Sequence, residues 1–238
     1  ELGLMVAVTH HQERLAGKLL LQLFDELAFM GTISVGQYVY RTPDGGFILF
    51  DTMNNAADVS NITLPQLQQA GIDPANIRAI VVTHGHGDHD GGVATLQSMF
   101  NTPPTIVGAA DYTNAKSYVA STKVDSTDLR LRPITIAGVE LGVMPTPGHT
   151  PGTTSYVLPV TYKGKVHKVA YWGGSAFPGT AADALKYLRS SEAMVSVIRS
   201  EGIDASINSH TFFDRTQSRI DKIRAVGLAD SDPMIQGT

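Results

Sequence analysis

Apolar positions along the chain follow two patterns, one typical of strands and the other typical of helices. Short runs of apolar and β-branched residues predict strands at residues 27–30, 36–41, 47–50, 77–82, 105–107, 134–136, 140–145, 155–159, 166–172 and 205–207. Apolar residues at helical spacing predict helices at residues 12–23, 62–70, 92–100, 183–200 and 216–226. Because the two kinds of element alternate without a clear linker, we expect one α/β domain over residues 1–238, with sheets covered by helices.

Turn and cap residues sharpen two of these predictions. The segment Thr-Pro-Asp-Gly-Gly at residues 42–46 has the composition of a turn, so the strands on either side of it should form a hairpin. Ser60 is a candidate cap for the helix at residues 62–70, and Gly71 is placed to end that helix.

Composition excludes several classes of partner. The 238 residues are 42% hydrophobic and 17% charged, with a formal net charge of −4. No apolar stretch has the roughly 18 residues that suggest a membrane span, and no basic cluster marks a nucleic-acid site. We therefore expect a small-molecule substrate, with no membrane and no nucleic acid as a partner; the oligomeric state stays open.

The chain begins at Glu1 rather than at a methionine. This suggests a processed N-terminus from which a signal peptide has been removed. We therefore expect a periplasmic or secreted protein, while the absence of cysteine is equally compatible with a cytoplasmic one.

The segment with the clearest chemistry is the run HGHGDH at residues 84–89, directly after a predicted strand. The chain has no cysteine, so a metal ion would have to be bound by His, Asp or Glu. Residues two apart in an extended chain share a face, so His84 and His86 can reach one ion. Asp88 and His89 follow at once, and so many ligands in one short run indicate two adjacent ions.

Three further polar residues follow predicted strands in the second half of the chain. His149 lies in the segment TPGHTPG, His210 follows Asn-Ser, and Ser175 follows Trp-Gly-Gly. Ligands at the ends of several strands are typical of sites in α/β proteins. We therefore expect the two histidines to complete the metal site.

These motifs together resemble the metallo-β-lactamase superfamily. The resemblance rests on the HxHxDH run, the TPGHTPG loop, the late histidine and Asp51, and it covers residues 27–224 in the expected order. It implies a four-layer αβ/βα sandwich, with residues 1–26 as an N-terminal extension. It also implies two zinc ions, the first held by His84, His86 and His149 and the second by Asp88, His89 and His210. Asp51 would orient the metal-binding loop through hydrogen bonds.

The segment at residues 171–178 favours one branch of the superfamily. Many of its hydrolases have a bridging aspartate there, whereas this chain has Gly173, Gly174 and Ser175 and no carboxylate. In this the chain is similar to the third subclass of class B β-lactamases, whose ligands are all His and Asp. Ser175 would then bind water or substrate, or else its hydroxyl would only cap the loop. Phe177 stands where that subclass usually has a second serine, and no lysine lies just beyond Ser175.

The resemblance implies a dinuclear zinc hydrolase in which a metal-bound hydroxide, oriented by Asp88 as the catalytic residue, opens a β-lactam or similar cyclic amide. A lactonase, thioesterase or other ester hydrolase on the same site is a second hypothesis. A non-catalytic metal-binding module is a third, against which the complete set of ligands argues.

Overall fold

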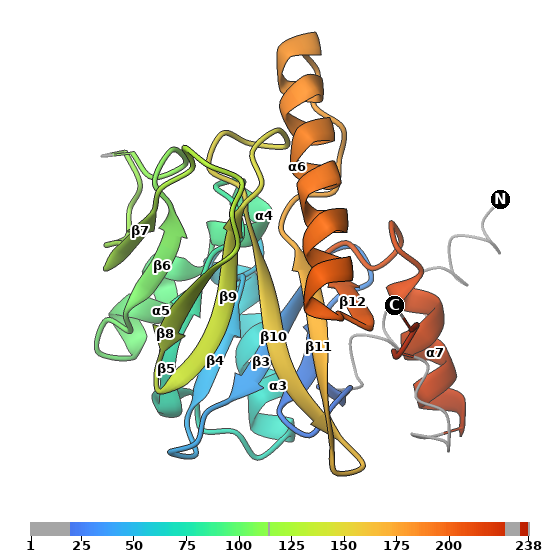
Figure 1. Cartoon of the computed structure of the whole chain (residues 1–238). Coiled ribbons are helices and arrows are strands. Elements are labelled where there is room, and N and C mark those ends of the chain that lie inside the picture. Colours follow the sequence, from blue (N-terminus) through green and yellow to red (C-terminus); the bar gives the residue numbers. More distant parts are fainter. Residues whose placement is uncertain (1–19, 114, 227–233, 238) are drawn as a thin grey trace, which may run out of the picture.

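The computed structural model describes residues 20–113, 115–226 and 234–237, which form two β-sheets with helices on their outer faces (Figure 1). The first sheet has seven strands in chain order: β1 (Leu21–Gln22), β2 (Leu27–Gly31), β3 (Gly36–Arg41), β4 (Phe47–Phe50), β5 (Ile77–Val81), β6 (Thr105–Gly108) and β7 (Thr122–Val124). Neighbours are antiparallel from β1 to β4 and parallel from β4 to β7.

The second sheet has five strands in the order β12-β11-β10-β9-β8. Their bounds are β8 (Arg132–Ile136), β9 (Val139–Pro145), β10 (Thr154–Tyr162), β11 (Lys165–Trp172) and β12 (Ala205–Asn208). All neighbours are antiparallel except β11 and β12, which are parallel. The parallel pair requires a crossover, and the long helix α6 (Ala181–Glu201) supplies it.

The main hydrophobic core lies between the two sheets. Tyr38 of β3 lies 5.1 Å from Tyr171 of β11, and Phe50 of β4 lies 5.7 Å from Tyr156 of β10, measured between ring centroids. All four rings are buried, and edge-to-face pairs of this kind add about 0.5–1.5 kcal/mol each beyond the area they bury. Because each pair joins one sheet to the other, these contacts hold the sheets face to face.

Helices cover the outer faces of both sheets. Ile80 of β5 shares a buried cluster with Leu67 of α3 (Leu64–Gln69) and Leu96 of α5 (Val93–Met99). On the other sheet, Ala170 of β11 shares a cluster with Ile198 of α6. The layers therefore run helix, sheet, sheet, helix, which confirms the expected αβ/βα sandwich. None of the described helices has the length and apolar character that crossing a lipid bilayer requires.

The start of the fold differs from the expectation. Most of the helix expected at residues 12–23 lies outside the described residues, but its described end forms the short strand β1, which pairs with β2. Leu23 and Phe24 are buried in the core between the sheets. The fold thus includes part of the expected N-terminal extension, because burial of these two side chains outweighs the helical spacing that predicted a helix.

The helix expected at residues 62–70 also begins earlier. It is the last part of a continuous helical segment made of α2 (Ala56–Asp58), the π-helical η1 (Val59–Thr63) and α3. Asn55 caps it by accepting hydrogen bonds from two backbone N–H groups, so the proposed cap Ser60 is wrong. Gly71 follows the helix with a φ of +71°, and its role in ending the helix is confirmed.

The remaining helices are the 3-10 turn η2 (Pro74–Asn76), α4 (Gly87–Asp90) and α7 (Thr216–Val226). The sequence pattern predicted neither the short α4 nor strand β7, because both are too short to show a period. α4 lies at the upper end of the sandwich in Figure 1, the end at which β4, β5, β11 and β12 finish. The predicted chemistry-bearing residues follow these strands, so the fold brings them to one place.

Candidate metal centre

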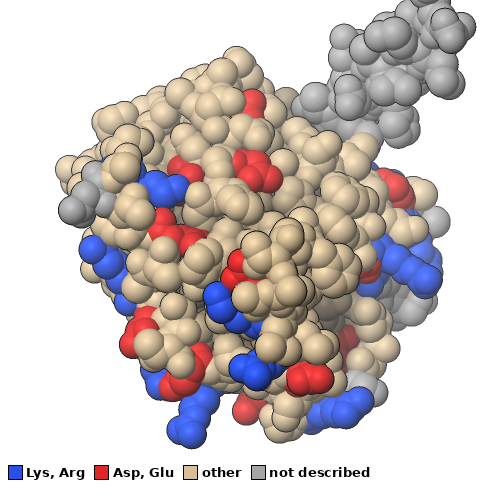
Figure 2. Space-filling view, turned by 90° about the horizontal axis from the view of Figure 1, so that it is seen from above, with Lys and Arg blue, Asp and Glu red and all other residues tan. Residues whose placement is uncertain are grey.

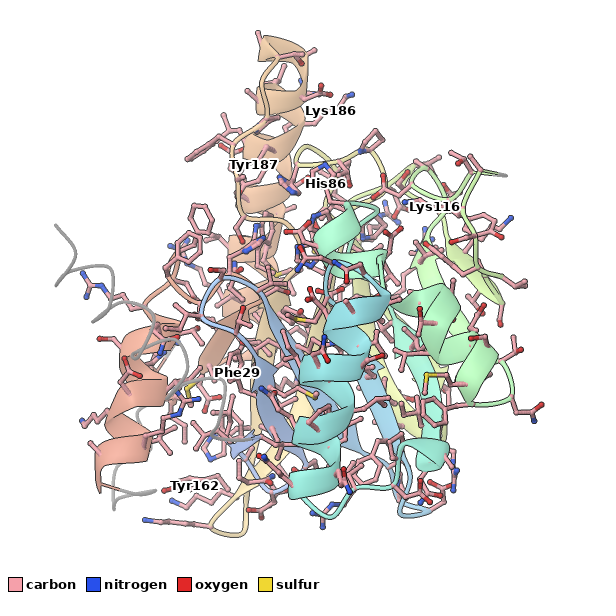
Figure 3. The ribbon with its side chains drawn as sticks, turned by 180° about the vertical axis from the view of Figure 1, so that it is seen from behind. Phe29, His86, Lys116, Tyr162, Lys186 and Tyr187 are labelled. Carbon is pink, nitrogen blue, oxygen red and sulfur yellow. The ribbon has the colours of Figure 1, made fainter. Side chains whose placement is uncertain are left out.

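Four histidines form a row at this end of the sandwich, in the order His149, His84, His89 and His210. Successive ring centroids are 4.5, 4.0 and 5.1 Å apart. His86 lies beside the row, 4.9 Å from His84 and 4.7 Å from His149. Figure 3 shows His86 at this end, next to α4, with Tyr187 of α6 on one side and Lys116 on the other. The fold thus gathers all five histidines that the sequence singled out.

Ligand atoms in this row come close enough to share metal ions. His84, His86 and His149 form one group whose ligand atoms all lie within 4.8 Å of one another, and His84, Asp88 and His89 form a second. The Nε2 atom of His210 lies 3.2 Å from Nε2 of His89 and 3.5 Å from Oδ2 of Asp88. The two expected ligand sets are therefore each brought together.

The hydrogen bonds of the histidines determine their tautomers. Three of them direct Nδ1 at backbone carbonyl oxygens: His84 at Gly173 (2.7 Å), His149 at Ala176 (2.8 Å) and His210 at Ser34 (2.7 Å). A carbonyl oxygen only accepts, so Nδ1 carries the proton in each ring. In the neutral imidazole, the Nε2 atom is then left with a free lone pair.

The Nε2 atoms face one another in pairs, 3.0 Å apart for His84 and His149 and 3.2 Å apart for His89 and His210. Two lone pairs at this distance repel unless a cation lies between them, and this applies directly to His84 and His149. Between His89 and His210 the cation can be a proton or a metal ion, because the pKa of His89 is raised to about 9. Zinc–nitrogen bonds of about 2.0–2.1 Å in tetrahedral geometry place two ligand nitrogens roughly 3.3 Å apart. The spacing and the nitrogen and oxygen donors therefore fit zinc or a similar divalent ion.

Asp51 holds parts of the histidine row in place by hydrogen bonds. It follows β4, is fully buried and has a φ of +60°, a conformation that Asp and Asn tolerate better than most residues. Its Oδ2 atom accepts from Nδ1 of His89 at 2.8 Å, and its Oδ1 atom accepts from the backbone N–H of Thr83 at 2.8 Å. The carboxylate thus orients His89 directly. Through Thr83 it also fixes the end of the strand that leads to His84.

Two buried hydroxyl groups also donate hydrogen bonds to the carboxylate of Asp51. Tyr171 of β11 donates to Oδ2 at 3.0 Å, and Ser209 donates to the same atom at 2.8 Å. The hydroxyls of Tyr171 and Ser209 also contact each other. The sequence analysis missed both residues, although Ser209 directly precedes His210. They connect Asp51 in the first sheet to the strands of the second sheet that lead to Ser175 and His210.

Burial and the charges of the site shift the pKa values of several of its residues. Burial, together with the neighbouring His89 and His149, holds the pKa of His84 well below its usual value. Burial also acts to lower the pKa of His89, but the Asp51 and Asp88 carboxylates outweigh it and raise this pKa to about 9. The hydrogen bond from His89 lowers the pKa of Asp88 to about 2. Asp88 is therefore an ionised carboxylate at neutral pH, as a metal ligand must be.

Asp111 connects the loop that contains His84 to the loop that contains His149, and the sequence pattern did not predict this role. Its carboxylate accepts from the backbone N–H of Gly85 at 2.8 Å and from that of Gly152 at 2.8 Å. The hydroxyl of Thr150 donates to it as well. Asp111 lies just after β6. Since functional polar residues of α/β proteins often follow strand ends, its position could have marked it as a candidate. Because Gly85 neighbours His84 and Thr150 neighbours His149, this carboxylate sets the distance between the loops.

Lys116 also contacts the metal-binding loop that contains Gly85. Its Nζ atom donates to the carbonyl oxygen of Gly85 at 2.8 Å and forms an ion pair with Asp90. Tyr118 donates to the same carboxylate at 3.2 Å. Lys116 is thus already paired within the protein.

Ser175 is buried, and its hydroxyl donates to Oδ1 of Asn208 at 2.6 Å. The same oxygen accepts from the backbone N–H of His210 at 2.9 Å. The hydroxyl therefore bonds to the end of β12 rather than to its own loop, and contact with water or substrate stays a prediction.

The glycines before Ser175 have no room for a side chain. A Cβ atom on Gly174 would lie 2.7 Å from Cβ of His149, and one on Gly173 would lie 1.9 Å from the carbonyl oxygen of Thr154. Side chains do not fit at either position with the backbone as it is. The segment therefore contributes to the site through its backbone, whose Gly173 carbonyl orients His84.

The fold and the histidine row define a metal-binding αβ/βα sandwich. A family model described as the metallo-β-lactamase superfamily matches residues 32–161, and the chain belongs to this superfamily. The superfamily and the His/Asp cluster together indicate a metal site.

Solved structures of two metallo-β-lactamases share the fold. The FEZ-1 enzyme from Legionella gormanii has a TM-score of 0.76 at 18% identity, with 93% of this chain and 89% of that chain covered. The BJP-1 enzyme from Bradyrhizobium japonicum, a subclass B3 metallo-β-lactamase, has a TM-score of 0.72 at 22% identity, with 91% and 86% covered. At these identities the likeness shows the fold alone.

Curated relatives match over shorter stretches. A hydroxyacylglutathione hydrolase from Rhodopseudomonas palustris (strain HaA2) is 40% identical over 79 residues, which cover 33% of this chain and 28% of that protein. A probable metallo-hydrolase, YybB, from Bacillus subtilis (strain 168) is 34% identical over 96 residues, which cover 37% of this chain and 43% of that protein. The chain thus matches less than half the length of either relative.

Proposed function

We propose that this chain is a metal-dependent hydrolase that opens a β-lactam or a similar cyclic amide with two zinc ions. The observation that carries the proposal is the close approach of the Nε2 atoms in the histidine row, above all the free Nε2 atoms of His84 and His149, 3.0 Å apart. His84, His86 and His149 would hold one ion, and Asp88, His89 and His210 the other. When bound, zinc would activate water as a nucleophile and polarise the carbonyl group of the substrate.

The protein's own residues position this chemistry. Backbone carbonyl oxygens hold His84, His149 and His210 in one tautomer, so their Nε2 atoms stay available as ligands. Asp51 holds His89 in the same way. The ionised Asp88 carboxylate can ligate the metal and orient the attacking water.

The absence of a carboxylate in the segment at residues 171–178 favours the cyclic amide over other substrates, because that segment resembles the β-lactamase branch. A second candidate is hydrolysis of a lactone, thioester or other ester on the same site. It is favoured by the similarity to a protein named hydroxyacylglutathione hydrolase over residues that make up 33% of this chain.

A substrate panel tests the proposal. Zinc-loaded protein is assayed with nitrocefin and a carbapenem, and in parallel with a lactone and a thioester, each with and without a chelator. We expect chelator-sensitive hydrolysis of the β-lactams. Hydrolysis of the lactone or thioester alone would contradict the β-lactam proposal and support the second candidate function.

A histidine variant tests the metal site separately. His86→Ala should lower both bound zinc and hydrolysis, whereas His167→Ala should leave both unchanged. His167 is a fair control, because it lies in β11 and pairs with Asp204 at 2.7 Å rather than with the row. Freshly purified protein that contains no transition metal and takes up none would contradict the proposal.

A further inference from the structure

Three phenylalanine side chains near the histidine row are unusually exposed. The exposed fraction is 84% for Phe177, 58% for Phe212 and 50% for Phe213. Phenylalanine is normally buried, and exposed apolar groups that lie together mark places where a ligand or partner binds.

Two of these rings stand at the His210 end of the row. The ring centroids of Phe212 and Phe213 lie 5.9 and 6.1 Å from that of His210, and 4.7 Å from each other. The backbone N–H of Phe213 donates to the carbonyl oxygen of His210 at 3.0 Å, which holds the segment in a turn. The two rings are therefore held next to a proposed ligand of the second zinc ion.

The third ring stands at the His149 end. Phe177 directly follows Ala176, whose carbonyl oxygen accepts from Nδ1 of His149. Its ring lies 5.4 Å from that of Tyr187 on α6, which in turn lies 5.6 Å from Trp172. Aromatic groups therefore flank both ends of the row.

Two lysines near the row, Lys116 and Lys186, are already paired within the protein. Lys116 is bound to Asp90 and to the carbonyl oxygen of Gly85, and Lys186 of α6 pairs with Asp183 at 2.8 Å. Figure 2, which looks down on this end of the molecule, shows a surface that is largely neither acidic nor basic. These surroundings favour an uncharged apolar group over a carboxylate.

We propose that Phe177, Phe212 and Phe213 determine specificity, and that they select substrates with an uncharged aromatic or aliphatic substituent beside the bond that is cleaved. This inference rests on the proposed function, since it places the scissile bond at the histidine row. The substituent packs against Phe212 and Phe213 at one end or Phe177 at the other and is thereby removed from water. A contact with an exposed aromatic ring should favour such a ligand by about fivefold to tenfold.

Binding of three thiols to the zinc-loaded protein tests the inference without relying on turnover. The thiols are mercaptoacetate, which is anionic, 2-mercaptoethanol, which is small and neutral, and benzyl mercaptan, which is aromatic. Their dissociation constants are measured by calorimetry. We expect benzyl mercaptan to bind about fivefold to tenfold more tightly than 2-mercaptoethanol, and mercaptoacetate to gain nothing from its charge.

Variants assign the preference to the three rings. The aromatic preference should fall in Phe177→Ala, Phe212→Ala or Phe213→Ala, and most strongly in the double variant of Phe212 and Phe213. Val166→Ala is the matched control, because Val166 is 75% exposed but lies at the start of β11, at the other end of that strand from Trp172. It should leave all three dissociation constants unchanged.

The two proposals fail in different ways. If mercaptoacetate binds most tightly, or if the aromatic preference survives in all the phenylalanine variants, the specificity inference is overturned while the metal site stands. If none of the thiols binds and the protein takes up no zinc, the proposed function is overturned and the specificity inference with it. A matched pair of penicillins, with a phenylacetyl or an acetyl side chain, should show the same preference in kcat/KM.

Discussion

The carboxylate of Asp51 accepts a hydrogen bond from Nδ1 of His89 at 2.8 Å, and both side chains are almost completely buried. This contact joins the end of β4 to the short helix α4, which follows β5. It fixes the His89 tautomer, so Nε2 points along the row toward His210. The position of a proposed zinc ligand therefore depends on a residue that does not itself contact the ion.

Asp51→Asn should weaken zinc binding about 10- to 100-fold, as loss of a partner to a metal ligand commonly does. Asn tolerates the φ of +60° at this position but brings an amide donor to atoms that already donate. The free energy of unfolding should also fall by about 2–3 kcal/mol. Competition with a chromogenic chelator and thermal denaturation measure the two effects.

Asp204→Asn is the control for this variant. Asp204 also accepts from a histidine Nδ1, that of His167, but outside the row. Its replacement should leave zinc affinity unchanged, and a change in zinc affinity of less than about twofold in Asp51→Asn would show that Asp51 does not position His89.

Tyr171→Phe should destabilise the protein and weaken zinc binding through Asp51. The change removes a buried hydroxyl that bonds to Asp51 and Ser209, which should cost about 1–2 kcal/mol of unfolding free energy. Tyr40→Phe loses a comparable bond, to the carbonyl oxygen of Pro159 at 2.6 Å. Both variants should lose stability, but only Tyr171→Phe should lose zinc affinity; an equal effect on zinc in both would refute this role for Tyr171.

Asp111→Ala should loosen the connection between the two metal-binding loops. It leaves the N–H groups of Gly85 and Gly152 without their partner, so the free energy of unfolding should fall by about 2–3 kcal/mol. Hydrogen exchange at these two amides should become faster, while Asp125→Ala, an exposed aspartate that bonds only to Thr127 nearby, should leave it unchanged. Unchanged exchange in Asp111→Ala would mean that the loops are held by other contacts.

Gly174→Ala should displace His149 from the row. The added Cβ atom would lie 2.7 Å from Cβ of His149, and a clash of this kind typically costs 1–3 kcal/mol. Zinc binding should weaken about tenfold or more. Gly179→Ala, whose Cβ atom would meet nothing within 4 Å, is the matched control. Normal zinc affinity in Gly174→Ala would show that the segment around Gly174 shifts to accommodate the methyl group without displacing His149.

Short-range patterns in the sequence determined much of the fold. Most strand and helix positions from residue 27 onward followed from apolar spacing, because a buried face repeats with the period of its element. The short α4 and β7 and the early start of the helical segment at Ala56 did not. The candidate ligands were also found from local patterns, four of them in the HGHGDH run and His149 and His210 from their places after predicted strands. At residues 20–23, the described part of the helix expected at residues 12–23, the prediction was wrong, because burial of Leu23 and Phe24 between the sheets decided that segment.

The sequence by itself determined which residues could bind metal, since ligand chemistry belongs to the side chain. Only the tertiary structure decided how those residues are held. Asp111 lies far along the chain from Gly85, and Tyr171 and Ser209 lie far along it from Asp51, so no local pattern shows that these residues are in contact. The tautomers of His84, His149 and His210 depend on backbone carbonyl oxygens that only folding brings within reach.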